Sequence, residues 1–433
     1  MPKPARETSS ATSAGGVRCA DCASVFPLDT PQSTCPSCGG LLLVEHHPKA
    51  SGEDLRALFD ERAAGMGRTT SALERSGVWR FREIVLAAAN DEIVSHPEGN
   101  TPLLKRDAVA RFAGVDSLLM KHEGHNPTGS FKDRGMTVAL TQARRIGARA
   151  VACASTGNTS ASLSAYASQA GIPSFVFVPE GNVSAGKLAQ TIAYGARTLQ
   201  IRGDFDVCLR LARAASDTLG VYLVNSVNPF RIEGQKTIVF EMLQQLGWNA
   251  PDWIALPAGN LGNTSAFGKA LAEAFSFGLI DRVPRLLAVQ AAGAAPFARA
   301  YADQFATRIT VHAETRATAI KIGDPASWDR AVRAIAGTNG VVESVTDEEI
   351  FAAKAVIDRC GVGCEPASAA SVAGVRALAA RGAIRRDERV IAVLTGHLLK
   401  DPGSAETKPG KAESKACTPD EALALLADVV SHA

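Results

Sequence analysis

One lysine, Lys132, stands in a segment whose residue types and spacing suit covalent chemistry on an amine. Residues 126–136 read Asn-Pro-Thr-Gly-Ser-Phe-Lys-Asp-Arg-Gly-Met. The apolar run at 118–121 predicts a buried strand before this segment, and apolar residues at helical spacing predict a helix over 136–146. Lys132 is therefore expected at a strand–loop–helix junction, where unpaired backbone N–H groups disfavour its charge and lower its pKa. A neutral amine in that position suits Schiff-base formation, whereas a solvated surface lysine needs no shaped loop.

Composition and length set wide limits on the class of protein. The chain has 433 residues, 46% of them apolar, which is ordinary for a soluble globular protein of about two or three domains. A net charge of +2 gives no reason to expect nucleic acid or an anionic membrane as a partner. Residues 1–16 are rich in Ser, Thr, Ala and Gly and lack the apolar core of a secretory signal. We interpret them as a disordered tail and expect a cytoplasmic protein.

Four cysteines near the start have the spacing of a metal site. Cys19, Cys22, Cys35 and Cys38 form Cys-x2-Cys-x12-Cys-x2-Cys. Two such pairs place four thiolates around one tetrahedral ion, which predicts a zinc ribbon over residues 17–45 with structural Zn²⁺. Disulfides or a redox pair, and iron, are the alternatives; disulfides are the weaker explanation in a chain without an export signal.

The predicted ribbon has few features of a nucleic-acid-binding module. Arg18 is its one basic residue between Val17 and Val44, while Asp21 and Asp29 are acidic. A phosphate-binding face needs several basic side chains, so the ribbon is expected to pack on the rest of the chain.

Strand and helix patterns alternate through most of the remaining sequence. Strand-like apolar runs lie at 150–154, 174–178, 221–224, 253–256, 286–289 and 390–394. Helical patterns lie between many of them, for instance at 184–194, 205–219 and 346–360. Continuous apolar strands joined by helices predict an α/β fold with parallel sheets covered on both faces, in which ligands sit on the strand-to-helix loops.

Polar loops follow four of these strands. The hydroxyls and amide of 154–160 suit a carboxylate, and the Gly-rich turn 257–264 suits an anion, although a helix cap and ordinary turn geometry are the respective alternatives. Segment 225–237 offers the planar guanidinium of Arg231, for which an exposed helix start is the alternative. Thr395 follows the last strand. The segment 364–369 is explained by a helix start with an acidic residue, Glu365.

These segments together resemble one family. The residues around Lys132 resemble the lysine motif of pyridoxal-phosphate enzymes of the tryptophan-synthase-β fold type, and most closely that of the threonine synthases. Segments 76–83 and 98–103 also match that pattern, so the resemblance runs from about residue 76 to 402. It implies a fold-type-II enzyme with two doubly wound parallel-sheet domains and the cofactor pyridoxal 5′-phosphate between them. The small N-terminal ribbon, expected from its cysteines, occurs in only some relatives.

The resemblance also implies a division of the chain. The expected parts are a tail at 1–16, the ribbon at 17–45, a helical connector or arm at 46–100, a larger cofactor-binding domain at 101–147 and 235–405, a smaller mobile domain at 148–234, and a C-terminal tail or helix at 406–433.

Site roles carry over from the family residue by residue. Lys132 is expected to bind the cofactor covalently and to act as the catalytic base. Asn158 is expected to contact the ring hydroxyl, and Thr395 the pyridine nitrogen, which a hydroxyl keeps neutral. The cradle for the cofactor's phosphate is expected at Gly259, Asn260, Leu261, Gly262 and Asn263. The substrate-binding residues are expected to be Ser155, Thr156 and Thr159 for the carboxylate, Asn225, Ser226, Arg231 and also Lys236 for the phosphate, and Asn260.

The implied reaction converts O-phospho-L-homoserine and water to L-threonine and phosphate, the work of a carbon–oxygen lyase acting on phosphates. Two anions must be bound, and the chain offers two anion sites, whereas a threonine or serine dehydratase needs only one. A cysteate synthase, which uses O-phosphoserine and sulfite, keeps both sites and stays an alternative, as does a non-catalytic binding protein of the same fold. Relatives imply a homodimer.

Overall fold

The computed structural model describes residues 12–13, 15–65, 73–155, 157–181, 185–203, 205–406, 418 and 421–422. The chain divides into two units, residues 1–401 and 402–433. The first unit contains every residue of the candidate site, and the second includes a short 3-10 helix, η6 (Pro402–Glu406). Most of the predicted tails at 1–16 and 406–433 lie outside the described residues.

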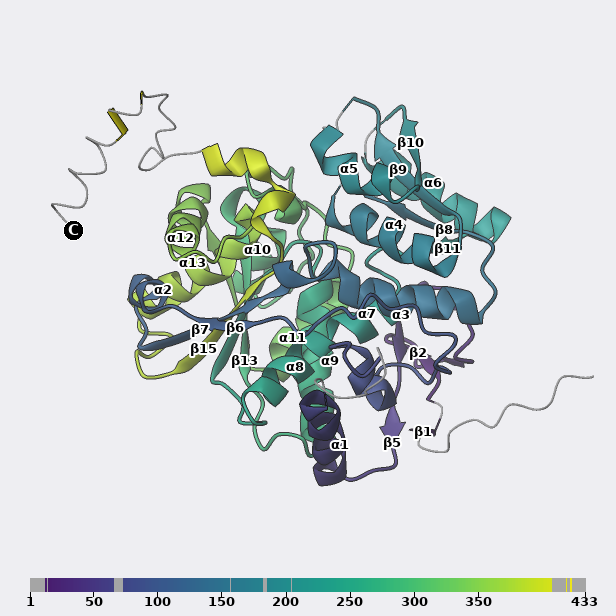
Figure 1. Ribbon diagram of the computed structural model, residues 1–433, viewed down its shortest axis with the longest axis horizontal. Helices are drawn as coiled ribbons and strands as arrows, with labels where there is room; N and C mark the ends of the chain where they lie inside the picture. Colours follow the sequence, from purple (N-terminus) through teal and green to yellow (C-terminus); the bar gives the residue numbers. More distant parts are fainter. Residues whose placement is uncertain are drawn as a thin grey trace, which may run out of the picture. The chain divides into compact units, whose positions relative to one another are not determined.

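The larger sheet has the strand order β14-β13-β12-β15-β7-β6 (Figure 1). Neighbouring strands are parallel except for β6, which runs antiparallel to β7. The bounds are β6 (Leu103–Lys105), β7 (Ser117–His122), β12 (Trp253–Pro257), β13 (Arg285–Ala291), β14 (Val341–Val345) and β15 (Arg389–Leu394).

Both faces of this sheet are buried, which explains the continuous apolar strands. Along β12, Ile254 and Leu256 enter one hydrophobic core, whereas Trp253 and Ala255 enter another. Because side chains alternate along a strand, the two cores lie on opposite faces of the sheet. The helices that contribute to the first core include α8 (Thr237–Gln245), α9 (Gly262–Ser276) and α11 (Trp328–Gly337), and those that contribute to the second include α2 (Asp107–Ala113), α12 (Asp347–Arg359) and α13 (Pro366–Ala380).

The smaller sheet has the order β10-β9-β8-β11, with all neighbours parallel. It lies in the upper right of Figure 1, and α3 and α7 lie beside one another below it. This arrangement confirms the predicted α/β fold with parallel sheets. The bounds are β8 (Val151–Ala154), β9 (Ser174–Pro179), β10 (Arg197–Ile201), β11 (Tyr222–Leu223), α3 (Lys132–Arg145), α4 (Asn158–Ala170), α5 (Ala185–Ala193), α6 (Phe205–Leu219) and α7 (Pro229–Gln235).

Among the described residues of 46–100, the helices are α1 (Gly52–Ala64) and the 3-10 helix η1 (Trp79–Ile84), so the segment is less helical than predicted. Side-chain hydrogen bonds organise the rest: the Glu98 carboxylate accepts from the hydroxyls of Ser76, Ser95 and Tyr166. The indole of Trp79 is fully buried and donates to Thr137 of α3 at 2.7 Å. The segment is thus part of the core that supports α3.

The N-terminal region forms a three-stranded antiparallel sheet, β3-β2-β4. It packs on the body of the chain: Arg330 of α11 donates to the carbonyl of Leu42, and Lys269 of α9 donates to that of Val44. The buried side chains of Val17, Leu42 and Val44 join the core that holds α9. The bounds are β2 (Val17–Cys19), β3 (Val25–Phe26) and β4 (Leu42–Val44); β1 (Thr12–Ser13) pairs separately with β5 (His47–Pro48).

A network of buried ion pairs links α3 to β7, η1 and α8. The carboxylate of Glu241 accepts from Lys121 at 2.5 Å, from Arg134 at 2.8 Å and from Arg80 at 2.9 Å. Arg134 also binds Glu123 through two nitrogens, at 2.7 and 2.8 Å. Burial opposes the ionisation of Glu241, but Arg134, Lys121 and Arg80 outweigh it and hold the pKa of this carboxyl well below its usual range.

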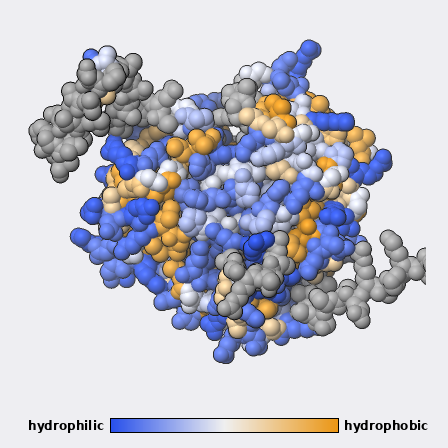
Figure 2. Space-filling model, in the orientation of Figure 1, coloured by the Kyte–Doolittle hydropathy of each residue, from blue (hydrophilic) through white to orange (hydrophobic). Residues whose placement is uncertain are grey.

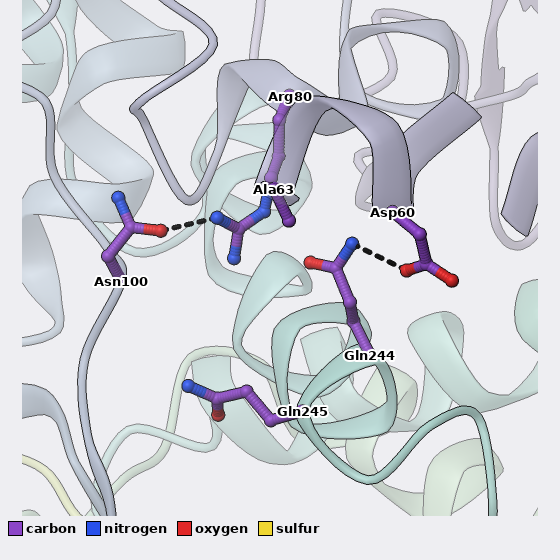
Figure 3. A pocket seen from close by; sticks show the side chains of 6 residues that line it. All are labelled: Asp60, Ala63, Arg80, Asn100, Gln244 and Gln245. Carbon is purple, nitrogen blue, oxygen red and sulfur yellow. Dashed lines mark hydrogen bonds between the residues drawn. The ribbon is translucent and has the colours of Figure 1, made fainter. Parts of the chain in front are cut away.

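A polar pocket of about 320 Å³ lies at the outer edge of this network (Figure 3). Arg80 reaches it with a hydrogen bond to Asn100, and Asp60 accepts from Gln244 at 2.9 Å. None of the residues that line it was predicted as a site residue, so this pocket is separate from the candidate site. The lining residues are Asp60, Ala63, Arg80, Asn100, Gln244 and Gln245.

The face of the molecule displayed in Figure 2 is mostly hydrophilic, with apolar residues in separate small patches. No helix in the described part of the chain has the length and apolarity that crossing a membrane requires.

We expect Glu241→Gln to lower the free energy of unfolding by about 3–5 kcal/mol, because it leaves buried cations without their shared anion. Denaturant unfolding at neutral pH measures this loss. The control is Asp116→Asn, which removes an exposed ion pair with Arg386 and is expected to cost about 1 kcal/mol or less. Equal losses in the two variants would contradict a central role for Glu241.

Candidate active site

Lys132 lies at the predicted loop–helix junction and is the first residue of α3, which begins four residues earlier than predicted. The loop before it is held against the loop that follows β15. Phe131 donates its backbone N–H to the carbonyl of Thr395 at 3.0 Å, and His397 donates to the carbonyl of Gly129 at 2.9 Å. Gly129 has a φ of +85°, a conformation that favours glycine. The two loops therefore form one continuous support beneath the lysine.

The amine of Lys132 lies 3.9 Å from the centre of the Phe131 ring. Among the described residues, none forms a hydrogen bond or an ion pair with it. Burial, reinforced by the positive charge of Arg231 and only partly opposed by Glu365, lowers the pKa of Lys132 to about 7. Near neutral pH this amine can therefore act as a nucleophile and as a base.

The neighbouring carboxylate of Asp133 holds the loop to α4. It accepts from the N–H and the hydroxyl of Thr128, at 2.7 and 2.6 Å, and from the hydroxyl of Ser162 at 2.6 Å. Burial raises the pKa of Asp133 to about 6. These contacts fix the direction in which α3 begins.

The predicted phosphate cradle lies at the start of α9. Leu261 has a φ of +62° and no side chain caps the helix, so its first N–H groups stay open. Both amide atoms of Asn263 and the hydroxyl of Thr264 are buried and have no hydrogen-bond partner in the described part of the chain. A Cβ on Gly259 would lie 3.0 Å from Ile320, so a larger residue would crowd this turn. Open donors and unpaired polar atoms suit an anion.

Two predicted loops meet beside the cradle. Asn260 donates from its amide to the hydroxyl of Ser226 at 2.7 Å, and its amide oxygen accepts from the backbone of Ala326 at 2.7 Å. Asn225 is fixed differently, because both ends of its amide bind the backbone of Ala154 at 3.1 Å. It therefore braces the strand end that leads to Ser155.

Arg231 is a buried cation without an acidic partner among the described residues. It is 1% exposed, and its Nη1 donates to the carbonyl of Val224 at 3.0 Å, while its Nε has no partner in that set. Burial lowers the pKa of Arg231 to about 10. A buried guanidinium beside Lys132 with a spare donor suits an anion.

Lys236 differs from Arg231, because two carboxylates already neutralise its charge. Its Nζ lies 2.5 Å from Glu233 and 2.7 Å from Glu273. His46 and Lys269 also bind Glu233. This cluster is a set of ion pairs that fastens the N-terminal region to α7 and α9.

Asn158 is the first residue of α4, and Thr395 directly follows β15; both contact Glu365. The segment around Glu365 also fits the family pattern, but Glu365 was explained as an acidic helix start and was not predicted as a site residue, so its contacts with two predicted site residues were not expected. Ser155 and Thr159 lie at the two ends of the loop between β8 and α4. The hydroxyl of Ser155 accepts from the backbone N–H of Gly157 at 3.3 Å. Thr156 lies outside the described residues.

The four N-terminal cysteines lie close together in the structure, although twelve residues separate the two pairs in the sequence. Cys19 and Cys38 have their sulfurs 3.4 Å apart, and Cys22 and Cys35 have theirs 3.6 Å apart. All four sulfurs lie within 4.8 Å of one another, and all four cysteines are free of disulfides.

In the cofactor-free protein, we expect the contribution of Lys132 to the free energy of unfolding to increase as the pH rises. Its folded pKa of about 7 lies below the usual value of about 10.4, so between those pH values the unfolded chain binds the extra proton. The free energy of unfolding of the wild type, minus that of Lys132→Met, is therefore expected to increase between about pH 7 and pH 10. Lys49→Met, at an exposed lysine, gives the baseline. A difference that stays constant with pH would count against a depressed pKa.

Comparisons with known proteins identify the family. Residues 94–396 match the family described as pyridoxal-phosphate dependent enzyme. A threonine synthase of Methanosarcina acetivorans is 45% identical over 389 residues, which cover 89% of this chain and 92% of that protein. A threonine synthase of Mycobacterium leprae is 51% identical over 310 residues, 71% of this chain and 84% of its own.

The fold is also similar to a solved structure. The processed form of threonine deaminase isoform 2 from Solanum lycopersicum superposes with a TM-score of 0.62 over 80% of this chain and 93% of its own. At 18% identity, this likeness concerns the fold alone. On the family match and the sequence relatives, the chain belongs to the pyridoxal-phosphate-dependent enzymes and, within them, to the threonine synthases.

Proposed function

We propose that this chain converts O-phospho-L-homoserine and water to L-threonine and phosphate, with pyridoxal 5′-phosphate bound to Lys132. The observation that carries the proposal is a low-pKa lysine with one open anion site beside it and a second at the start of a neighbouring loop–helix turn. One is the buried guanidinium of Arg231, and the other is the start of α9 with the unpaired atoms of Asn263 and Thr264. The cofactor and the substrate each bring one phosphate.

The residues present fit the cofactor. The open N–H groups of α9 and the buried, unpaired amide of Asn263 suit its phosphate, and Lys132 offers the amine for the covalent bond. Asn158 and Thr395 would hold the ring hydroxyl and the ring nitrogen, respectively. When bound, the cofactor supplies an electron sink for carbanions next to the amino group.

The chain's own residues then bind the substrate and move protons. Lys132, with a pKa of about 7, can take one proton from Cα and one from Cβ of the substrate, and can deliver one proton to Cγ and one back to Cα. Arg231, with Ser226 and Asn260, would hold the phosphate that leaves Cγ, and water adds at Cβ. The hydroxyls of Ser155 and Thr159 would orient the carboxylate.

Product analysis tests the choice of substrate. Purified protein is supplied in parallel with O-phospho-L-homoserine, with O-phosphoserine and sulfite, and with threonine. We expect threonine and phosphate from the first. Cysteate from the second mixture would favour the cysteate synthase alternative, and 2-oxobutanoate from threonine alone would favour a dehydratase.

We also propose that the N-terminal sheet is a zinc ribbon. Around a tetrahedral Zn²⁺ with bonds of about 2.3 Å, neighbouring thiolates lie about 3.8 Å apart, close to the spacing of these sulfurs. No fifth ligand is expected, so the ion would be structural. The homodimer and the cytoplasmic location stay predictions.

For the substrate phosphate, we expect Arg231→Ala to lower kcat/KM for O-phospho-L-homoserine roughly a hundredfold, because a charge-assisted contact worth about 2–3 kcal/mol is lost. The visible absorption of the bound cofactor is expected to change little. Arg386→Ala, at an exposed arginine, is the control. If Arg231→Ala instead released the cofactor and had normal kinetics once saturated with it, the two phosphate sites would be assigned the wrong way round.

For the ribbon, we expect elemental analysis to find one zinc ion per chain in the wild type and none in the Cys19→Ser/Cys22→Ser variant. Because the ion would be structural, chelation is expected to lower thermal stability more than the rate of reaction. Cys208→Ser, at a buried cysteine outside the cluster, is the control. Zinc-free protein of unchanged stability would contradict a structural site.

A further inference from the structure

Arg330 of α11 is a buried cation that has no acidic partner among the described residues. It is 5% exposed, and its hydrogen bond in that set runs from Nη2 to the neutral carbonyl of Leu42 in β4. Its Nε and Nη1 are buried and have no partner there. Arg333, one turn later, differs because it forms an exposed ion pair with Asp21 at 2.7 Å. Burying an unpaired guanidinium is costly, so the surroundings of Arg330 favour a nearby anion.

The acidic residues near Arg330 do not balance its charge. Glu233 attracts the guanidinium, but this carboxylate already pairs with two lysines. Asp21 also attracts it, but that carboxylate is already bound by Arg333. Burial outweighs both attractions and lowers the pKa of Arg330 to about 10.

A second cation, Lys269 of α9, binds the same edge of the N-terminal sheet. It donates to the carbonyl of Val44, two residues after Leu42 along β4. Its ammonium also pairs with Glu233, so its charge is neutralised by the body of the chain. Of these two cations that bind β4, Arg330 is the one whose charge still needs a partner.

The cysteine cluster, which consists of Cys19, Cys22, Cys35 and Cys38, belongs to the sheet that Arg330 contacts. Leu42 lies in the edge strand β4 and pairs with Cys19 of β2. Neighbouring strands are about 4.8 Å apart, so one strand spacing and one hydrogen bond place the guanidinium within roughly 10 Å of the Cys19 backbone. Arg333 gives a second link, since its partner Asp21 donates a backbone N–H to the Cys19 sulfur at 3.4 Å.

A bound metal ion would give this cluster a negative charge. Four thiolates and one Zn²⁺ sum to a formal charge of −2. The one basic residue between Val17 and Val44 is Arg18, and it already pairs with Glu45 at 2.7 Å. Compensation for the loaded cluster must therefore come from another part of the chain. Arg330 is a buried cation at the edge of this sheet, and its Nε and Nη1 have no partner in the described part of the chain.

We propose that Arg330 is the charge partner of the metal-loaded cysteine cluster, so that metal binding tightens the docking of the N-terminal sheet on α11. With the ion bound, the cluster and the guanidinium compensate each other's burial. Without the ion, Arg330 stays buried and unpaired, which disfavours the docked arrangement. Arg330 is thus a positioning residue for the metal site and not a ligand. The inference rests on the proposed zinc ribbon and is independent of the lyase reaction.

The test is the zinc affinity of the full-length protein, measured by competition with a chromophoric chelator. Arg330→Gln removes the charge but keeps a donor for the carbonyl of Leu42. We expect it to weaken zinc binding roughly tenfold, the lower end of the effect of partners outside the ligand set. Arg330→Lys restores a cation and is expected to recover most of the affinity. Unchanged affinity in Arg330→Gln, or an equal loss in Arg330→Lys, would overturn the proposal.

Arg333→Gln is the matched control on the same helix. It removes an exposed ion pair, so we expect the zinc affinity to change little. A loss as large as that of Arg330→Gln would contradict a special role for the buried arginine.

Hydrogen exchange of the wild type carries the test if Arg330→Gln does not fold. When zinc is removed by chelation, we expect amides of α11 to exchange faster, together with those of the N-terminal sheet. Amides of α12, on the opposite face of the larger sheet, are expected to exchange as before. Faster exchange confined to the N-terminal sheet would refute the proposal. A wild type that binds no zinc would refute the ribbon and this proposal together, whereas failure of the proposed lyase reaction would show separately in the product analysis.

Discussion

The carboxylate of Glu241 accepts hydrogen bonds from three buried cations that come from three separate segments: Lys121 in β7, Arg134 in α3 and Arg80 in η1. Each of these groups would be costly to bury alone, and removing the shared anion would leave charges without compensation. Because Arg134 is two residues after Lys132, this network fixes the start of α3. The position of Lys132 thus depends on the buried ion pairs that Glu241 makes with these three cations.

Other polar groups of the candidate site lack such compensation. Arg231 is buried without an acidic partner in the described part of the chain, and the start of α9 leaves the polar atoms of Asn263 and Thr264 unpaired. Such an arrangement lowers the stability of the empty site and favours anions when they bind. It suits the proposed reaction, in which both the cofactor and the substrate bring a phosphate. Burial with one positive neighbour also keeps Lys132 close to neutrality.

Much of the fold could be predicted from the sequence, because strands buried on both faces, such as β12, are continuous apolar runs. The edge strands β10 and β14 were missed, since polar residues interrupt their apolar runs: Arg197, Thr198 and Gln200 in β10, and Glu343 and Ser344 in β14. The pairing of Arg134 with Glu241 joins residues 107 positions apart, so no local pattern indicates it.

The candidate site was predictable only in part. The lysine loop and the start of α9 were found because glycines and polar residues gather after apolar strands, and the roles of these residues stay predictions. Glu365 was overlooked because an acidic residue before a helix has an ordinary local explanation; its importance follows from contacts with Asn158 and Thr395, 207 and 30 residues away. Lys236, whose charge is neutralised by Glu233 and Glu273, could likewise not be distinguished from Arg231 without knowing the partners of each.

The central claim is that the unbalanced charge around Lys132 makes this one lysine the attachment point of the cofactor. Borohydride reduction of the loaded protein, followed by peptide mass spectrometry, tests it most directly. The account predicts a pyridoxyl group on the peptide that contains Lys132, and none in Lys132→Ala. A pyridoxyl group on Lys121, Lys236 or Lys400 instead would contradict it.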